Sequence, residues 1–157
     1  MRVALGADHA GVALKASVKA RLETRGIEVD DFGAASNESV DYPDYAARVA
    51  NAVAEGAADF GILVCGTGVG MAIAANKIAG IRAAPVVELD STRLARQHND
   101  ANILAIGARV TSPDVALAIV DTFLDTPFEG GRHQRRIDKI AALEQPSAHA
   151  QARQGTS

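Results

Sequence analysis

The sequence predicts a single-domain α/β fold built around a parallel β-sheet. Short apolar runs of strand length alternate along the chain with longer segments whose apolar residues recur at helical spacing. Strands that alternate with helices form βαβ units, which place parallel strands in one sheet with ligands at their carboxyl ends. The aromatic content of 4% agrees with an aliphatic α/β core rather than an aromatic-rich β-sandwich. At 157 residues the chain is long enough to bury such a core.

Five short apolar runs are expected to be the strands. The first of them, Val3–Leu5, leads into a loop over residues 6–11. Runs of this length are too short for typical helices and suit buried strands. The predicted strands cover residues 3–5, 27–29 with an extension to Phe32, 60–64, 82–87 and 103–106.

Six segments between and after these runs are expected to be helices. In the first, Leu14, Val18 and Leu22 lie on one helix face, and Gly26 ends the segment. Ser112-Pro113 is a suitable N-cap and first-turn pair for a later helix. The predicted helices cover residues 12–22, 45–54, 67 or 69 to 78, 91–98, 115–124 and 132–143. We assign residues 1–145 to the domain and residues 146–157 to a flexible polar tail.

Charge and composition exclude several classes of protein. The net charge is −3 and the acidic and basic residues are interleaved, which indicates neither a nucleic-acid surface nor a membrane surface. A single cysteine excludes an internal disulfide, and paired-cysteine zinc motifs are absent from the sequence. The chain opens on a strand-like run instead of a signal-peptide pattern, and no apolar run approaches the roughly 20 residues that cross a bilayer. We therefore expect a cytoplasmic protein without nucleic-acid or membrane partners.

The segment Leu63–Gly70 (LVCGTGVG) is the most informative motif. It reads as a buried strand that runs into a glycine-rich turn and the start of a helix, with Cys65 at the junction. Backbone N–H groups in such a turn attract anions and favour a thiolate. The motif predicts a reactive nucleophile or base beside an anion-binding turn, and a buried cysteine before a tight turn explains it equally well.

Known glycine-rich motifs fit this segment poorly. Met71 occupies the place where a dinucleotide-binding fingerprint needs its last glycine, and the Gly-Lys-Ser/Thr of a Walker loop is missing. Gly66, Gly68 and Gly70 have the spacing of a methyltransferase turn. That class usually has an acidic residue just before the first glycine, where this chain has Cys65.

Other chemically capable residues are expected in loops next to strand ends. Each has a plain structural explanation on its own, such as a helix cap for Asp8, loop packing for Tyr42 or a surface charge for Arg109. We expect these residues to lie together at one edge of the sheet, where they would form a single site. The residues are Asp8 and His9 after the first strand, Tyr42 after the second, His98 and Asn99 before the fifth, and Arg109 after the fifth.

A second feature is the basic segment around Arg132 and Arg136. The two arginines are four residues apart, so both lie along one face of the predicted last helix. Two guanidinium groups in this arrangement suit a phosphate, and Gly130-Gly131 leaves backbone N–H groups accessible to an anion. A solvated basic face on a terminal helix is the alternative.

Seven blocks of the sequence together resemble the type B ribose-5-phosphate isomerases, whose family also contains the galactose-6-phosphate isomerase subunits. The blocks follow one another in family order and at family-like spacing over residues 1–145. Such a set is far more specific than any single motif. The blocks are Gly6–Gly11 (GADHAG), Asp41–Pro43 (DYP), Cys65–Gly70 (CGTGVG), Ala75–Lys77 (ANK), Gly80–Ala83 (GIRA), Arg96–Asp100 (RQHND) and Gly130–Gln134 (GGRHQ).

The resemblance implies a Rossmann-like α/β/α sandwich with a five-stranded parallel sheet. It implies a homodimer or a dimer of dimers with the active site at the subunit interface. The implied reaction interconverts ribose 5-phosphate and ribulose 5-phosphate without a metal or another cofactor. In this family the cysteine equivalent to Cys65 is the base; some relatives use a glutamate, at a position that corresponds here to Ala74 or its neighbour.

The resemblance also implies the roles of individual residues. Cys65 moves the proton between C2 and C1, Thr67 assists this transfer, and His98 opens the furanose ring. The remaining expected substrate-binding residues are Asp8 and Asn99 for hydroxyl groups, Tyr42 at the sugar, the amides of Gly66, Gly68, Val69 and Gly70 for the enediolate oxygen, and His9, Arg109, Arg132 and Arg136 for the phosphate.

Other functions stay open at this point. The segment Pro85–Asp90 is atypical for the family, so another aldose phosphate such as allose 6-phosphate is an alternative substrate. A galactose-6-phosphate isomerase subunit is less favoured, because those work as unlike pairs and one partner lacks the full catalytic set. A non-catalytic sugar-phosphate sensor is a further alternative, although Cys65, Thr67 and His98 argue against it. A methyltransferase is the weakest alternative.

Overall fold

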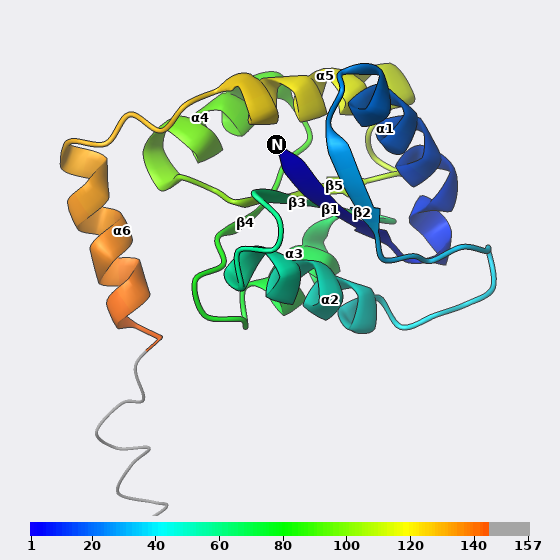
Figure 1. Cartoon of the computed structure of the whole chain (residues 1–157), viewed down its shortest axis with the longest axis horizontal. Helices are drawn as coiled ribbons and strands as arrows, with labels where there is room; N and C mark the ends of the chain where they lie inside the picture. Colours follow the sequence, from blue (N-terminus) through cyan, green and yellow to red (C-terminus); the bar gives the residue numbers. More distant parts are fainter. Residues whose placement is uncertain (145–157) are drawn as a thin grey trace, which may run out of the picture.

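A computed structural model describes residues 1–144 and shows one five-stranded, fully parallel sheet. The order of the strands across the sheet is β2-β1-β3-β5-β4 (Figure 1). This confirms the predicted α/β fold with a parallel sheet. The strands are β1 (Arg2–Ala7), β2 (Glu28–Asp31), β3 (Phe60–Cys65), β4 (Ala83–Pro85) and β5 (Ile103–Gly107).

Helices cover both faces of the sheet and make an α/β/α sandwich (Figure 1). α1 (Val12–Thr24) and α5 (Pro113–Asp125) pack on one face, and α2 (Tyr42–Ala54) and α3 (Val69–Ala75) pack on the other. α4 (Leu89–Asn99) lies beside α5, and α6 (Arg132–Ala142) projects from the body next to α4. A single 3-10 turn, η1 (His9–Gly11), joins β1 to α1.

The three central strands are buried almost throughout, and this burial holds the two helical layers together. β1, β3 and β5 are buried along nearly their whole length, as their continuous apolar runs predict for a parallel sheet covered on both faces. The edge strand β2 has the acidic sequence EVDD instead, and Arg2 pairs with Glu28 across it. Charged side chains on an edge strand discourage pairing with another sheet.

Several boundaries differ from those predicted. α2 begins at Tyr42 rather than residue 45, because Pro43 suits the first turn of a helix. α3 ends at Ala75 rather than residue 78, because the Asn76 side chain leaves the helix to bond with the backbone N–H and C=O of Ala83. β4 is reduced to three residues at the sheet edge, and β2 ends before Phe32. The predicted tail, residues 146–157, lies outside the described residues.

The chain reverses its direction across the sheet between β1 and β3. β2 lies on one side of β1 and β3 on the other, so the loops after β1 and β3 diverge to opposite faces. Such a switch point is where open α/β sheets bind ligands. Gly11 allows the loop after β1 to lie against β3, since a Cβ atom at this position would be 2.4 Å from the carbonyl oxygen of Val64. No helix among residues 1–144 has both the length and the apolar character that a membrane span requires.

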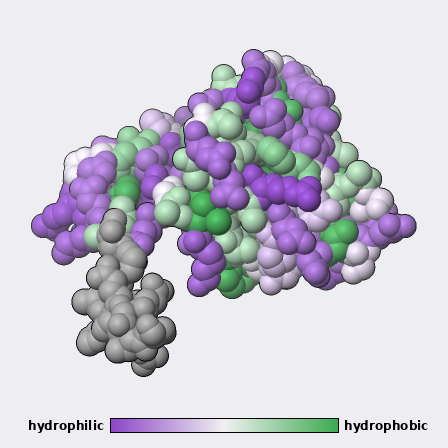
Figure 2. All heavy atoms as spheres, turned by 60° about the horizontal axis from the view of Figure 1, so that its bottom comes forward, coloured by the Kyte–Doolittle hydropathy of each residue, from purple (hydrophilic) through white to green (hydrophobic). Residues whose placement is uncertain are grey.

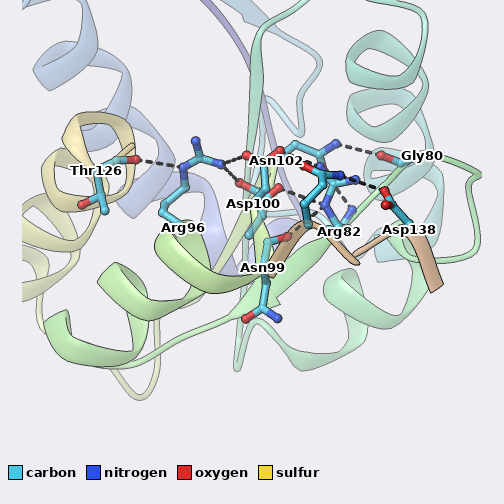
Figure 3. Close-up of polar contacts among 10 residues, drawn as sticks. Gly80, Arg82, Arg96, Asn99, Asp100, Asn102, Thr126 and Asp138 are labelled. Carbon is cyan, nitrogen blue, oxygen red and sulfur yellow. Dashed lines mark hydrogen bonds and ion pairs between the residues drawn. The ribbon is translucent and has the colours of Figure 1, made fainter. Parts of the chain in front are cut away.

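Arg96 ties the end of α4 to the core. The residue is 6% exposed, and its guanidinium carbon lies 4.9 Å from the ring centroid of Phe60 and 5.6 Å from that of Phe123. The guanidinium donates to the carbonyl oxygens of Thr126 and Ala101 and pairs with the Asp100 carboxylate (Figure 3). These contacts hold the turn that joins α4 to β5.

Replacing Arg96 with leucine should lower the free energy of unfolding by about 3 kcal/mol, because buried carbonyl oxygens lose their donors. Arg93 on the same helix gives a matched control, since its exposed pair with Asp90 is worth about 0–1 kcal/mol. Urea unfolding of Arg96→Leu and Arg93→Leu measures both values. Equal losses in the two variants would contradict the role assigned to Arg96.

Candidate active site

The turn after β3 directs a backbone amide at the Cys65 thiol. Cys65 is 5% exposed, and its Sγ atom accepts a hydrogen bond from the N–H of Gly68 at 3.1 Å. The N–H of Val69 points to the Thr67 hydroxyl at 3.4 Å. An N–H donor aimed at sulfur is available to hold negative charge there. The predicted junction of strand, glycine turn and helix is confirmed.

Glycines let neighbouring segments close over this turn. A Cβ atom on Gly66 would lie 3.0 Å from an Arg109 guanidinium nitrogen, and one on Gly70 would lie 2.8 Å from the Tyr42 ring. The backbone N–H of Arg109 donates to the carbonyl oxygen of Gly66 at 3.0 Å. The loop after β5 and the start of α2 therefore both meet the turn at Cys65.

Asp8 and His9 reach the same edge from the end of β1. The Asp8 Oδ1 atom accepts from the N–H groups of Ala10 and Gly11, so this carboxylate caps the 3-10 turn. The His9 Nδ1 atom accepts from the N–H of Val40 at 3.3 Å. A ring whose Nδ1 is an acceptor has its proton on Nε2, which leaves an N–H donor for an anion.

These residues form one group, which we call the carboxyl-edge cluster because each strand that supplies it does so at its carboxyl end. The structure brings together the predicted site residues from three strand ends and from the first turn of α2. The cluster consists of Asp8, His9, Tyr42, Cys65, Gly66, Thr67, Gly68, Val69, Gly70 and Arg109.

A second group, the amino-edge cluster, lies where α4 meets α6. It consists of His98 and Asn99 at the end of α4, Arg132 and Arg136 on α6, and His133. The five side chains line a hollow of about 410 Å³ together with apolar residues of α6.

His133 and Glu129 were not among the predicted site residues. The imidazole of His133 stacks on that of His98, with 4.2 Å between centroids and 11° between planes. Glu129 Oε2 lies 3.6 Å from His133 Nε2 and 4.0 Å from His98 Nε2. Removal from water lowers the pKa of His133, the charges of His98 and Arg132 lower it further, and Glu129 acts in the opposite direction. The four-residue spacing of Glu129 and His133 was the signal available in the sequence.

The expectation that the loop residues beside strand ends share one edge of the sheet is wrong for His98 and Asn99. In the pairing of β3 with β5, Gly61 lies opposite Ile103 and Cys65 lies opposite Gly107. The end of α4 therefore lies at the level where β5 begins, and Cys65 lies about 13 Å further along the strands. A residue that precedes a parallel strand lies at its amino end, and the prediction ignored this polarity.

A larger hollow of about 660 Å³ separates α6 from the segment between α3 and β4 (Figure 2). Its lining includes the apolar side chains of Ile78, Ile81 and Ile140, and it contains no residue of the carboxyl-edge cluster. Ile140 and Leu143 remain exposed beside it, at 43% and 82%. This hollow leaves an apolar face of α6 uncovered within the described part of the chain.

The atypical segment Pro85–Asp90 follows β4 at the sheet edge. β5 lies between β4 and β3, so one strand separates this segment from the turn at Cys65. The Glu88 carboxylate accepts from the N–H groups of Ser91 and Asp90 and so caps α4. A hydrogen bond from the Ser91 side chain is the main cause that lowers the pKa of Glu88, and the two backbone N–H groups lower this pKa further. The segment thus has a structural role in starting α4.

Gly68→Ala should destabilise the protein more than Gly80→Ala does. Both glycines have φ near +80°, which strains an L residue by about 1–2 kcal/mol. A Cβ on Gly68 would also lie 3.1 Å from the backbone of Ala105 and Ile106, whereas nothing lies within 4 Å of one on Gly80. We expect the close contact to add about 1–3 kcal/mol, measured by urea unfolding. Similar losses in both variants would show that the turn is not tightly packed.

Comparisons with known proteins agree on one family. The model of the family described as Ribose/Galactose Isomerase matches residues 3–140. Ribose-5-phosphate isomerase B of Escherichia coli K12 is 54% identical over 144 residues, which cover 92% of this chain and 97% of that protein.

Solved structures give the same result. The structure of ribose-5-phosphate isomerase B from Clostridium thermocellum matches with a TM-score of 0.91 and 53% identity, over 92% of this chain and 97% of that one. The structure of ribose-5-phosphate isomerase B from Mycoplasma genitalium with bound ribulose 5-phosphate matches with a TM-score of 0.88 and 45% identity, over 91% and 95%.

Proposed function

This chain belongs to the ribose/galactose isomerase family, and we propose that it interconverts D-ribose 5-phosphate and D-ribulose 5-phosphate with Cys65 as the base. The observation that carries this proposal is the Cys65 sulfur under the Gly68 amide, among residues that suit a phosphosugar. The relatives with this activity in their names are similar over nearly the whole chain, which supports the assignment.

The reaction needs a base beside C2 of the open-chain sugar and stabilisation of an enediolate. The Cys65 thiolate removes the C2 proton, the electron pair of that C–H bond becomes the C1–C2 double bond, and the negative charge moves to O1. Return of the proton to C1, with transfer of the hydroxyl proton from O2 to O1, gives the ketose. Thr67 lies two residues away and assists the transfer between oxygens.

Two kinds of interaction lower the barrier of this step. A positioned general base contributes roughly 10² to 10⁴ in rate. Amides of the turn at Gly66–Gly70 hold the enediolate oxygen, and a well-placed donor of this kind is worth about 2.7–4 kcal/mol. Neither interaction draws on a cofactor.

The phosphate lies at the opposite end of the sugar and fixes C1 and C2 beside Cys65. His9 offers its Nε2–H group and Arg109 its guanidinium from the carboxyl-edge cluster. Asp8 and Tyr42 lie at the same edge and face the sugar. Arg132 and Arg136 supply further charge-assisted hydrogen bonds to the phosphate.

A homodimer with shared active sites unites the two clusters. His98, Asn99, Arg132 and Arg136 lie at the amino edge of their own sheet and are too far from their own Cys65 to act on the same sugar. In a two-fold dimer, each amino-edge cluster faces the carboxyl-edge cluster of the second chain. His98 then opens the sugar ring, and Asn99 orients its hydroxyl groups. The exposed apolar residues Val69 and Ile73 beside one cluster, and Ile140 beside the other, suit such an interface.

We also place the protein in the cytoplasm, as the sequence predicts. A thiol that acts as a base must stay reduced, and the cytosol keeps thiols reduced. Detection of the protein in an oxidising cell compartment would contradict this part of the proposal.

Cys65→Ala should lower kcat by at least about 10²-fold and leave substrate binding nearly unchanged. A coupled assay on ribose 5-phosphate and on allose 6-phosphate gives the rates, and calorimetric titration with ribose 5-phosphate gives binding. Full activity in the variant would remove Cys65 as the base. Turnover of allose 6-phosphate alone would change the substrate and keep the mechanism. Binding without turnover in the wild-type protein would indicate a sensor.

Mixing two inactive variants tests the shared site. Cys65→Ala and His98→Asn chains, unfolded and refolded together in equal amounts, should regain about one quarter of the wild-type activity. Random pairing makes half of the dimers contain one chain of each variant. In such a dimer one of the two sites receives both an intact Cys65 and an intact His98, and the other site receives neither. Refolding each variant alone is the control. A mixture that stays as inactive as its components would show that Cys65 and His98 act within one chain or that the chain is not a dimer.

A further inference from the structure

Three metal-binding side chains meet at the amino-edge cluster. His98 comes from the last turn of α4, His133 from the first turn of α6 and Glu129 from the segment just before α6. Their ligand atoms all lie within 4.8 Å of one another. Within residues 1–144 this is the one group of three or more His, Cys, Asp or Glu side chains with that geometry. The mechanism proposed above uses His98 and gives no role to Glu129 or His133.

The donor set selects the class of ion. Two imidazoles and one carboxylate suit Zn²⁺ and other late first-row divalent ions, whereas Mg²⁺ and Ca²⁺ prefer oxygen ligands alone. We propose that His98, Glu129 and His133 bind one Zn²⁺ and that this ion inhibits the isomerase by occupying His98. Three protein ligands leave a fourth position for water or an anion.

The distances are close to those that a bound ion requires. A tetrahedral Zn²⁺ with bonds of 2.0–2.1 Å holds its ligand atoms about 3.4 Å apart. Glu129 Oε2 is already 3.6 Å from His133 Nε2 and 4.0 Å from His98 Nε2. The two rings lie nearly parallel, so they need to tilt toward each other as the ion enters.

α6 has the freedom to make this adjustment. It packs mainly against α4 and stands away from the remaining body (Figure 1). Gly130 and Gly131, which directly precede it, have φ values of 65° and 57°. A small rotation about these two residues moves His133 relative to His98 and Glu129 without disturbing the sheet. Glu129 stays beside His98, because its backbone N–H donates to the carbonyl oxygen of Gln97 in α4 at 3.1 Å.

Charged side chains around the site act in both directions on the binding of a cation. Arg132 and Arg136 line the same hollow, and their positive charges weaken the binding of a cation. Glu129 supplies the compensating negative charge within the ligand set. His98 is partly exposed, with a side-chain exposure of 36%, so an ion has access from the solvent.

Inhibition follows because Zn²⁺ and the sugar ring compete for the same imidazole nitrogen of His98. An imidazole nitrogen that is bound to Zn²⁺ has no lone pair or proton to offer to a sugar ring. This consequence rests on the proposed function, because it assumes that His98 opens the ring. Binding of the ion does not rest on it and is measured separately.

The binding test uses the tag-free full-length chain after treatment with a chelator, titrated with ZnCl₂ in a calorimeter. We expect one Zn²⁺ per chain, and at least about tenfold weaker binding by Glu129→Gln and by His133→Gln. The exposed position of Glu129 makes its variant informative even if His133→Gln is unstable. Cys65→Ser is a control that should keep the affinity, because Cys65 belongs to the carboxyl-edge cluster. Unchanged binding by Glu129→Gln and His133→Gln, or loss of binding in Cys65→Ser, would overturn the site.

The inhibition test follows the turnover of ribose 5-phosphate at a Zn²⁺ concentration that saturates the wild-type site. The wild-type protein should lose most of its activity, and Glu129→Gln should keep most of its own metal-free rate. Equal inhibition of both proteins would overturn the inhibitory role. No turnover even without Zn²⁺ would instead count against the proposed function, while the calorimetric result would still decide the metal site.

Discussion

The common direction of the strands is the constraint on which the arrangement of this protein depends. All five strands are parallel, so the loops that follow strands gather at one edge of the sheet and the turns that precede strands gather at the other. The chain distributes its chemistry over both edges. Cys65 ends a strand, His9 and Arg109 follow strands, and His98 precedes one. The two clusters are separated in space, and the proposed dimer is the arrangement that would join them.

Close packing of the backbone creates the environment of Cys65. The turn after β3 lies directly against the backbone of β5, and Gly68 is the residue that permits this approach. The same turn points an amide at the Cys65 sulfur. Tyr42 and Arg109 close over Gly70 and Gly66, so that residues from three parts of the chain surround the turn. The glycine spacing in the sequence thus serves close contact between segments of the chain.

The amino-edge cluster combines one helix end that is anchored to the core with one helix that has few contacts to the rest of the domain. Arg96 anchors the end of α4 against the rings of Phe60 and Phe123. It also donates to the carbonyl oxygen of Thr126, as Figure 3 shows. α6 carries the facing residues and has little contact with the sheet. The helix that carries His98 is therefore anchored to the core. The helix that carries Arg132, His133 and Arg136 is able to shift its position. This combination fits both proposals for the cluster, the site shared with a second chain and the binding of a metal ion.

The sequence by itself determined the order of the elements, the parallel sheet and the junction of strand, glycine turn and helix at Cys65. These features depend on local patterns: apolar runs, helical spacing and glycines at turns are all properties of neighbouring residues. The family also follows from the sequence, because its seven blocks lie in order along the chain. Only the tertiary structure decided which residues meet. The distance between His98 and Cys65 depends on strand polarity and register, and the group of His98, Glu129 and His133 depends on how α6 packs against α4. Neither is a property of residues that are neighbours in the chain.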